Sequence, residues 1–368
     1  MLIMKKILFL TPHVPSNRAG GENFTRLLLL ALAENNEVDL IYYKYKEDPF
    51  YEPSKNIRVL CAKENSTLVK LKNFILYPFV HPLFSVRFDW SLLLFIQKTI
   101  SANNYDLLYL DHSQMALYGK FFPKIKKIIM SHDVMAQRYS RKGNKLIKRY
   151  ILRSEGNLIK FPNTIVFSFS EKDKNIIREV YNCDSKVTNF ILENMVIDAC
   201  PTKISKRIVF MGKWKRADNF EGLKWFFKHC YNSISKGVEI VIIGKWLPEE
   251  FLNIINNYGN VKYLGFVENP YKLIADSIAV ISPLFSGAGV KVKVVESLAC
   301  GTPVIGTNIA FEGISKQFES FMFLANTPHD YVKCIENIDI SITERINFKT
   351  GFIKSYQSET ITNYIEQI

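Results

Sequence analysis

Cysteine pairs and long apolar runs are both missing from this sequence of 368 residues. The six cysteines are scattered and none forms a C-x-x-C pair, so neither a zinc site nor a disulfide framework is indicated. No segment reaches the roughly 18 apolar residues that a membrane-spanning helix needs. The first residues, MLIMKK, lack the apolar stretch and cleavage site of a signal peptide. We therefore expect a reduced, cytoplasmic protein.

Two motifs are absent as well, and each absence narrows the chemistry. Residues 11–22 contain no G-x-G-x-x-G, which disfavours an oxidoreductase that binds a dinucleotide. No Asp-x-Asp pair stands at the end of a predicted strand, so we predict no metal site. We also expect no cofactor.

Acidic residues are too few in residues 1–200 to balance the basic ones. Residues 1–200 hold 29 Lys and Arg against 19 Asp and Glu, which gives +10 of the net charge of +13. Residues 120–149 carry ten basic residues and a single acid, Asp133. Such a patch would attract phosphates, nucleic acid or an anionic membrane, although a solvated helix face has the same composition.

Apolar strands alternate with amphipathic helices along the chain, a pattern typical of parallel sheets flanked by helices. In the first part we predict strands at 6–11, 37–43, 106–111, 127–132 and 164–170 and a helix at 22–35. The pattern restarts at 207, with strands at 207–212, 238–244, 261–266, 277–283 and 303–307 and a helix at 219–234. The predicted fold class is therefore α/β, with two Rossmann-like, doubly wound domains facing across a cleft. We place them at 1–196 and 207–350, with a linker near 196–206 and a C-terminal helix in 351–368 that packs back on the first domain.

The stretch SPLFSGAGVKVKVVESLACGTPVIGT, residues 282–307, carries the most specific chemistry. A strand ends at Pro283, and we expect a helix to begin near Val290. The loop between them is built of small residues that let backbone N–H groups approach an anion: Gly287, Ala288 and Gly289. Lys293 and Glu296 share one helix face and suit a diphosphate and a ribose diol. The alternative is a surface Lys–Glu pair after an ordinary glycine turn.

Four segments together resemble the GT-B-fold glycosyltransferases of family 4, or group 1. GVKVKVVESLACGTPVIGT resembles the core of that family's C-terminal domain, and KILFLTPHVPSNRAGGENFTRLLLLALAE resembles its opening strand, glycine loop and first helix. IVFMGKWKRADNFEGLKWF and VKYLGFVENPYKLIADSIAVISPL are similar to the segments between. The likeness runs in the expected order over roughly residues 5–315.

The resemblance implies a role for each matching residue. It implies that Lys213 and Lys293 meet the donor diphosphate and that His132 lies beside the transferred sugar, which makes these three the predicted catalytic residues. The residues implied to bind the donor are Gly20, Gly21, Phe266, Gly287, Ala288, Gly289, Val290 and Glu296. Of these, Glu296 would hold the ribose, Phe266 would line the base, and Gly20 and Gly21 would lie under the donor phosphate.

Two departures from the family pattern leave alternatives open. Eight residues before Glu296, where the family has its first glutamate, this chain has Ala288. Lys215 and Arg216 compete with Lys213 for the place of the basic residue. An inactive scaffold partner of another transferase, or a sugar-nucleotide epimerase of the same shape, is therefore kept as a rival.

The function implied is transfer of a hexose from a UDP- or GDP-sugar to a hydroxyl of a glycan or lipid-linked glycan. The resemblance implies surface polysaccharide synthesis, such as lipopolysaccharide or capsule, with retention of configuration and without a metal. We expect an enzyme that is cytoplasmic or peripheral on the inner face of the membrane, with an anionic membrane surface as a candidate partner and no nucleic-acid partner.

Three other features of the sequence, Asp133, His112 and the segment 69–88, each allow two interpretations. Asp133 could orient His132 or act as a base, but we predict that it caps a helix at 134–141. His112 also follows a strand, and packing is favoured there over an acceptor-side role. The aromatic and basic segment 69–88 could dip into a membrane interface, but burial in the first domain is the favoured prediction.

Overall fold

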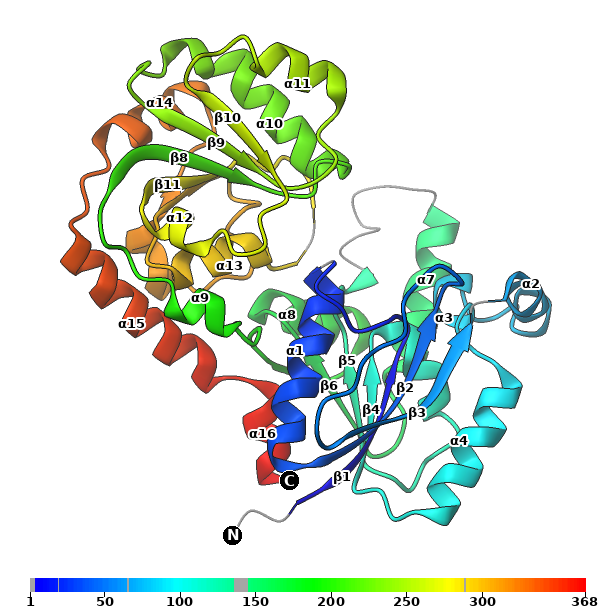
Figure 1. Cartoon of the computed structure of the whole chain (residues 1–368). Helices are drawn as coiled ribbons and strands as arrows, with labels where there is room; N and C mark the ends of the chain where they lie inside the picture. The colour runs from blue at the N-terminus through cyan, green and yellow to red at the C-terminus, as the bar shows by residue number, and fades with distance from the viewer. Residues whose placement is uncertain (1–3, 19, 65, 136–144, 288) are drawn as a thin grey trace. The chain divides into compact units, whose positions relative to one another are not determined.

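The computed structural model describes residues 4–18, 20–64, 66–135, 145–287 and 289–368. The chain forms two compact units (Figure 1), one made of residues 1–191 and 359–368 and the other of residues 192–358. None of the helices in the described ranges is long and apolar enough to cross a membrane.

The first unit is built on a seven-stranded parallel sheet in the order β3-β2-β1-β4-β5-β6-β7. Its strands are β1 Lys6–Thr11, β2 Glu37–Lys44, β3 Ile57–Glu64, β4 Leu107–Asp111, β5 Lys127–Met130, β6 Thr164–Ser168 and β7 Ser185–Val187. The strand order reverses between β1 and β4, and ligands of such sheets bind beyond the carboxyl ends at this switch point. A ligand is therefore expected near the residues that follow β1, β4 and β5.

Helices cover both faces of this sheet. They are α1 Gly20–Asn35, α2 Thr67–Leu76, α3 Pro82–Ser85, α4 Trp90–Ala102, η1 Ser113–Met115, α5 Ala116–Gly119, α7 Lys145–Leu158, α8 Glu171–Tyr181 and α16 Ile361–Gln367. α1 buries Phe24, Leu28 and Leu32, which lie on one face because they are four residues apart. α16 packs against α1, and its Ile361 and Ile365 are fully buried.

The second unit repeats the plan with a six-stranded sheet in the order β10-β9-β8-β11-β12-β13. Its strands are β8 Ser205–Met211, β9 Glu239–Ile243, β10 Val261–Gly265, β11 Ser277–Ser282, β12 Val304–Gly306 and β13 Met322–Leu324. Every strand pair is parallel, and the order reverses between β8 and β11. The carboxyl ends of β8 and β11 are thus the second place where a ligand is expected.

The helices of the second unit are α9 Asn194–Asp198, α10 Ala217–His229, η2 Tyr231–Ser233, α11 Glu249–Ile255, α12 Tyr271–Ala275, α13 Val292–Ala299, η3 Lys316–Phe321, α14 Pro328–Asn337 and α15 Ile342–Ser358. α15 is anchored by cations that are buried and hydrogen-bonded. The guanidinium of Arg345 donates to the carbonyls of Ser277 (2.6 Å) and Ile278 (2.9 Å), at the start of β11. Lys349 donates to the carbonyl of Ala299 at 3.0 Å. Burial lowers the pKa of Arg345 to about 10, still far above neutrality.

The predicted fold class is confirmed, because both sheets are parallel and doubly wound. Every predicted strand is present, but β3, β7 and β13 were missed. β7 and β13 have only three residues each, and β3 is an edge strand that is largely half-buried. The predicted helix at 134–141 lies mostly outside the described residues.

The prediction that residues 69–88 are buried is wrong for α2 and for Phe79, and right for Phe84 and Phe88. Phe84 and Phe88 are buried in the core of the first unit, whereas Leu71 and Ile75 of α2 are exposed. The segment splits in this way because Pro78 and Pro82 interrupt it. α2 ends before the first proline and α3 begins at the second, although the two helices remain in contact.

Candidate active site

The loop that follows β11 leads into α13 through two glycines with left-handed backbone. Gly287 has φ +130° and Gly289 has φ +70°, conformations that side chains rarely adopt. α13 begins at Val292, with Lys291 as its N-cap, two residues later than the expected start at Val290. Ala288 lies outside the described residues. The first N–H groups of α13 lack partners within the helix and can serve an anion.

Asn219 connects the end of β8 to α13. The ammonium of Lys293 donates to Asn219 Oδ1 at 3.0 Å, and Asn219 Nδ2 donates to the backbone carbonyl of Lys213 at 3.2 Å. Asn219 therefore links the side chain of Lys293 to the backbone of Lys213, although the two lysines are 80 positions apart in the sequence. Asn219 lies in the first turn of α10 and was not predicted.

Burial lowers the pKa of Lys293 to about 8. The carboxylate of Asp218 opposes this shift, while the cations Arg216 and Lys291 add to it. Cations gathered around a buried ammonium in this way are poised to bind an anion, since a bound phosphate would relieve their repulsion. The structure thus supports an anion site at the start of α13.

Glycines bring the carboxyl ends of β8, β9 and β10 close together. Gly244 has φ +127°, and a Cβ there would lie 1.7 Å from the carbonyl oxygen of Gly212. Two basic residues in this region lie beside aromatic rings. The Lys213 ammonium is 4.7 Å from the ring centre of Trp246, and that of Lys245 is 4.2 Å from Phe266.

Phe266 leaves most of its ring open to solvent at the end of β10, with 59% exposed. An exposed aromatic ring at a strand's carboxyl end can stack on a flat base. This position is consistent with the predicted role of Phe266, which stays a prediction.

Glu296 lies one turn beyond Lys293 on α13 and hydrogen-bonds the hydroxyl of Tyr271 on α12. Burial raises the pKa of Glu296 to about 7, against the opposing bond from Tyr271, and the nearby charge of Glu193 raises it further. Near neutral pH the side chain is therefore part carboxylate and part acid. Tyr271 fixes its position and was not predicted from the sequence.

In the first unit, the buried carboxylate of Asp111 collects polar groups from the ends of β1, β4 and β5. One oxygen lies 2.8 Å from Nε2 of His132. The other accepts hydrogen bonds from Thr11 at 2.9 Å and from Thr25 of α1 at 2.6 Å. Burial acts to raise the pKa of Asp111, but the two neighbouring histidines and the His132 bond outweigh it, so that the pKa is lowered.

The imidazole of His132 lies flat against that of His112, with ring centres 3.4 Å apart and planes 9° apart. Burial, followed by the charge of His132, holds the pKa of His112 well below its usual range, so His112 is neutral. Gly21, in the first turn of α1, approaches both rings. A Cβ there would lie 3.4 Å from Cε1 of His112 and 3.6 Å from Nδ1 of His132. Gly21 and His132, predicted separately, are thus neighbours.

His13, Asp111 and His112 could in principle hold a metal, since their ligand atoms lie within 4.8 Å of one another. The oxygens of Asp111, however, already accept hydrogen bonds from His132, Thr11 and Thr25. A carboxylate so engaged fits a metal poorly.

Several expectations can now be compared with the geometry. One alternative from the sequence was that Asp133 orients the ring of His132. In the structure the carboxylate that contacts His132 is that of Asp111. Gly20 begins α1, and Val290 stands in the loop before α13. A signal for Asp111 was present, because it ends the predicted strand DLLYLD at a switch point. Asn219 and Tyr271 offered no comparable signal.

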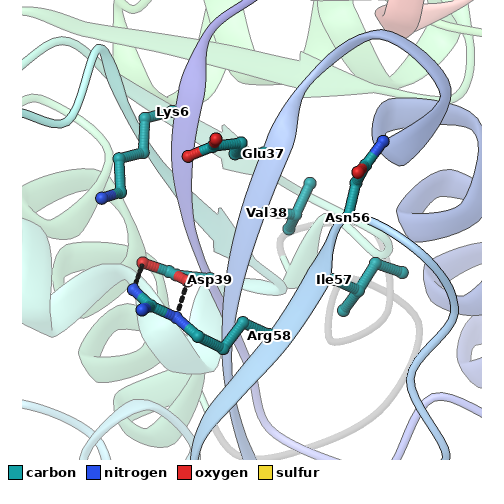
Figure 2. Close-up of a pocket in the computed structure, with 7 residues that line it drawn as sticks. All are labelled: Lys6, Glu37, Val38, Asp39, Asn56, Ile57 and Arg58. Carbon is teal, nitrogen blue, oxygen red and sulfur yellow. Dashed lines mark hydrogen bonds and ion pairs between the residues drawn. The ribbon is translucent and has the colours of Figure 1, made fainter.

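A hollow of about 350 Å³ lies elsewhere, at the amino ends of β1, β2 and β3 (Figure 2). There the Arg58 guanidinium grips both oxygens of Asp39 at 2.8 and 2.7 Å. Burial acts to raise the pKa of Asp39, but its hydrogen bonds from Arg58 and Tyr105 lower it overall. Because Arg58 and Asp39 neutralise each other, neither offers a free charge to a ligand. We therefore interpret their pairing as a contact that stabilises the fold.

Solved glycosyltransferases share this architecture over nearly the whole chain. HepE of Anabaena, solved with UDP, is 17% identical, with 98% of each chain covered and a TM-score of 0.68. The sucrose-phosphate synthase of Thermosynechococcus elongatus is 13% identical, with 99% of this chain and 96% of that chain covered and a TM-score of 0.66. WaaG, a glycosyltransferase involved in lipopolysaccharide biosynthesis, is 11% identical, with 98% of this chain and 97% of that chain covered and a TM-score of 0.59. The fold is therefore that of the GT-B glycosyltransferases.

The sequence of the second unit is similar to a known family. Residues 205–338 match the family model described as Glycosyl transferases group 1. A protein of Klebsiella pneumoniae, described as an uncharacterized 44.6 kDa protein in the cps region, is 23% identical over 98% of this chain and 99% of its own length.

Proposed function

We propose that this protein transfers a hexose from a UDP- or GDP-sugar to a hydroxyl group of a glycan or lipid-linked glycan in surface polysaccharide synthesis. The observation that carries the proposal is the Lys213–Asn219–Lys293 group beside Glu296, within the residues that match the group 1 glycosyltransferase family. It offers cations for a diphosphate and, one helical turn away, a carboxylate for a ribose diol. HepE, which was solved with UDP and with UDP-glucose, supports a nucleotide-sugar donor.

In this proposal the second unit stabilises the departing diphosphate. Lys213, Lys293 and the N–H groups at the start of α13 supply fixed positive charge where negative charge develops as the glycosidic bond breaks. The bond to the sugar re-forms with the acceptor oxygen on the same face, and the leaving diphosphate takes the acceptor's proton. The reaction therefore retains configuration and needs neither a metal nor a cofactor.

We assign the sugar end of the donor to His132 in the first unit. Asp111 keeps a lowered pKa and is an anion, so it holds the Nε2 proton of His132 and leaves Nδ1 free for a ligand. Nδ1 is the atom that lies near Gly21. A hydrogen bond there can strengthen in the transition state because Asp111 keeps the ring from rotating.

The acceptor and the place of action are the least constrained parts of the proposal. WaaG acts in lipopolysaccharide biosynthesis, and the Klebsiella relative is encoded in a cps region, which favours a lipid-linked or capsular glycan. The basic first half of the chain favours work at the anionic inner face of the cytoplasmic membrane.

One assay tests the proposal directly. The protein is incubated with UDP- and GDP-sugars, and release of the free nucleotide is followed with and without glycan acceptors. We expect slow hydrolysis of one donor, lost in Lys293→Ala. Donor binding without turnover would favour an inactive scaffold, the rival suggested by Ala288. Inversion of a sugar carbon without release would favour an epimerase.

A further inference from the structure

Helix α2 has its apolar residues outside and a polar residue inside. Asn73 is the buried residue of this helix, with 2% of its surface exposed. Leu71 is 61% exposed and Ile75 is 70% exposed, and they lie on one helix face because they are four positions apart. Helices at a protein surface normally show the opposite arrangement. An exposed apolar face of this kind indicates a surface that binds a partner or a membrane.

The orientation of α2 is fixed by specific hydrogen bonds. The amide of Asn73 donates to the carbonyls of Ser85 at 2.8 Å and Phe88 at 2.5 Å, both in the segment that follows the helix. The hydroxyl of Ser66 caps the first turn by accepting from the N–H of Val69. Turning the apolar face inward would break both hydrogen bonds of Asn73 and would leave the carbonyls of Ser85 and Phe88 without this partner.

Further exposed apolar residues lie just after α2 and at the start of α7. Phe79, just after α2, is 86% exposed, and Leu146 at the start of α7 is 75% exposed. The two elements are joined, since the Tyr150 hydroxyl of α7 donates to the carbonyl of Pro78 at 2.6 Å. We call this the α2–α7 surface, and its main residues are Leu68, Leu71, Phe74, Ile75, Phe79 and Leu146.

Charges of a single sign accompany the α2–α7 surface. Residues 66–88 contain three Lys or Arg and no Asp or Glu, and residues 145–153 contain four Lys or Arg and again no acid. Lys72, Lys145 and Arg149 are exposed. Exposed leucine and phenylalanine among exposed cations match the boundary between lipid tails and anionic headgroups.

We propose that the α2–α7 surface inserts into the interface of an anionic lipid bilayer. Leu71, Ile75 and Phe79 enter the boundary of the acyl chains, while the lysines and arginines contact the headgroup phosphates. A membrane fits better than an acidic protein partner, because apolar rings and cations are interspersed along the same helices. The inference adds a partner to the proposed function but rests on it only for the lipid-linked nature of the acceptor.

The test uses the full chain and vesicles of phosphatidylcholine with or without phosphatidylglycerol. We expect cosedimentation with the anionic vesicles that falls as salt rises, and little binding to the neutral ones. The triple variant Leu71→Ser/Ile75→Ser/Phe79→Ser should bind at least about tenfold more weakly. The double variant Lys72→Glu/Arg149→Glu should lose the preference for anionic vesicles.

A matched control removes an exposed apolar residue elsewhere. Ile254→Ser on α11 of the second unit, where the side chain is 50% exposed, should bind vesicles like the unaltered protein. Unchanged melting temperatures would show that the variants fold. The inference is overturned if the unaltered chain binds neither vesicle, if the triple variant binds normally, or if both vesicles bind equally. Hydrolysis of the donor sugar in solution should persist in the triple variant, so a failed transferase assay and a failed membrane assay are separate results.

Discussion

Asp111 and His132 form a buried carboxylate–imidazole pair, 2.8 Å apart, across the neighbouring strands β4 and β5. Thr11 and Thr25 hold the second oxygen of Asp111, so the carboxylate cannot turn away. A histidine held in this way has a defined tautomer and ring plane. The pair therefore makes His132 a stronger candidate for chemistry than its position after a strand alone could indicate.

Replacing Asp111 by Asn should impair turnover more than donor binding. The amide would donate to Nε2 or leave it unpaired, so the His132 proton would move to Nδ1 and face the ligand. We expect kcat to fall on the order of 10²-fold or more, with little change in the affinity for UDP or GDP. Nitrogen chemical shifts of labelled histidine would report the tautomer directly. An unchanged tautomer together with a lowered kcat would assign Asp111 a merely structural role.

His132→Ala should likewise cut transfer on the order of 10²-fold while free nucleotide still binds. The double variant with Asp111→Asn should be little worse than either single variant, because both changes remove one function. Steady-state kinetics of the three variants, with calorimetric titration of UDP and GDP, make the comparison. If nucleotide affinity collapses in His132→Ala, the residue is not on the sugar side; if transfer stays normal, His112 is the next candidate.

Glu296→Gln should weaken nucleotide binding and change its pH dependence. Loss of a charged hydrogen bond to ribose should cost about 1.5–3 kcal/mol. Because the pKa of Glu296 is raised to about 7, its carboxylate forms as the pH rises through neutrality, and affinity for UDP or GDP should rise over the same range. Calorimetric titration at pH values on either side of about 7 measures this rise, which the variant should lack. Equal affinities in variant and unaltered protein would remove Glu296 from the site.

Lys293 should set the upper limit of that pH range. Its pKa of about 8 means that the ammonium loses its proton above this value, so the affinity for a diphosphate should fall again at higher pH. Bound nucleotide raises the pKa of Lys293, so the fall should begin at higher pH when donor is saturating. In Lys293→Met this fall at high pH, the alkaline limb, should disappear from the pH profile of nucleotide affinity. Its persistence would assign that limb to another group.

Asn219→Ala tests whether the link that Asn219 makes between Lys293 and the backbone of Lys213 matters to the site. Without the amide, Lys293 loses its 3.0 Å partner and the segment after β8 loses its tie to α10. We expect nucleotide affinity to fall by about 1 kcal/mol, the size of one hydrogen bond. Asn253→Ala on α11 is a suitable control, since that side chain is exposed. A loss equal in both variants would point to general destabilisation.

Much of the architecture could be predicted because strands and helices are local patterns. The runs KILFLT and SIAVIS are apolar except at their end residues, as is typical of strands buried on both faces. Their alternation with helices predicts that the strands of each sheet run parallel. The glycine loop before α13 could be found because positive φ values demand a particular residue type. Helical spacing showed that Lys293 and Glu296 share one helix face, but their predicted roles depended on the resemblance to the family.

The residues that sequence reasoning missed depend on contacts between distant segments. Asn219 matters because α10 carries it to a lysine 74 positions later, and Tyr271 matters because α12 faces Glu296. The exposure of α2 was missed for a related reason. A helix of apolar residues is predicted to be buried unless the buried bonds of Asn73, which hold its apolar face outward, are known.

The return of the chain to the first unit has a consequence for how that unit can be made. Because residues 359–368 belong to the first unit, neither that unit nor its core is encoded by one continuous stretch. Ile361 and Ile365 fill space against the first unit, and the backbone of Ile361 is bonded to the Thr188 hydroxyl at 2.8 Å. A stop codon after Ser358 would therefore damage the unit at the opposite end of the gene. Expressing the first unit alone would require a fused or separately supplied copy of its last ten residues.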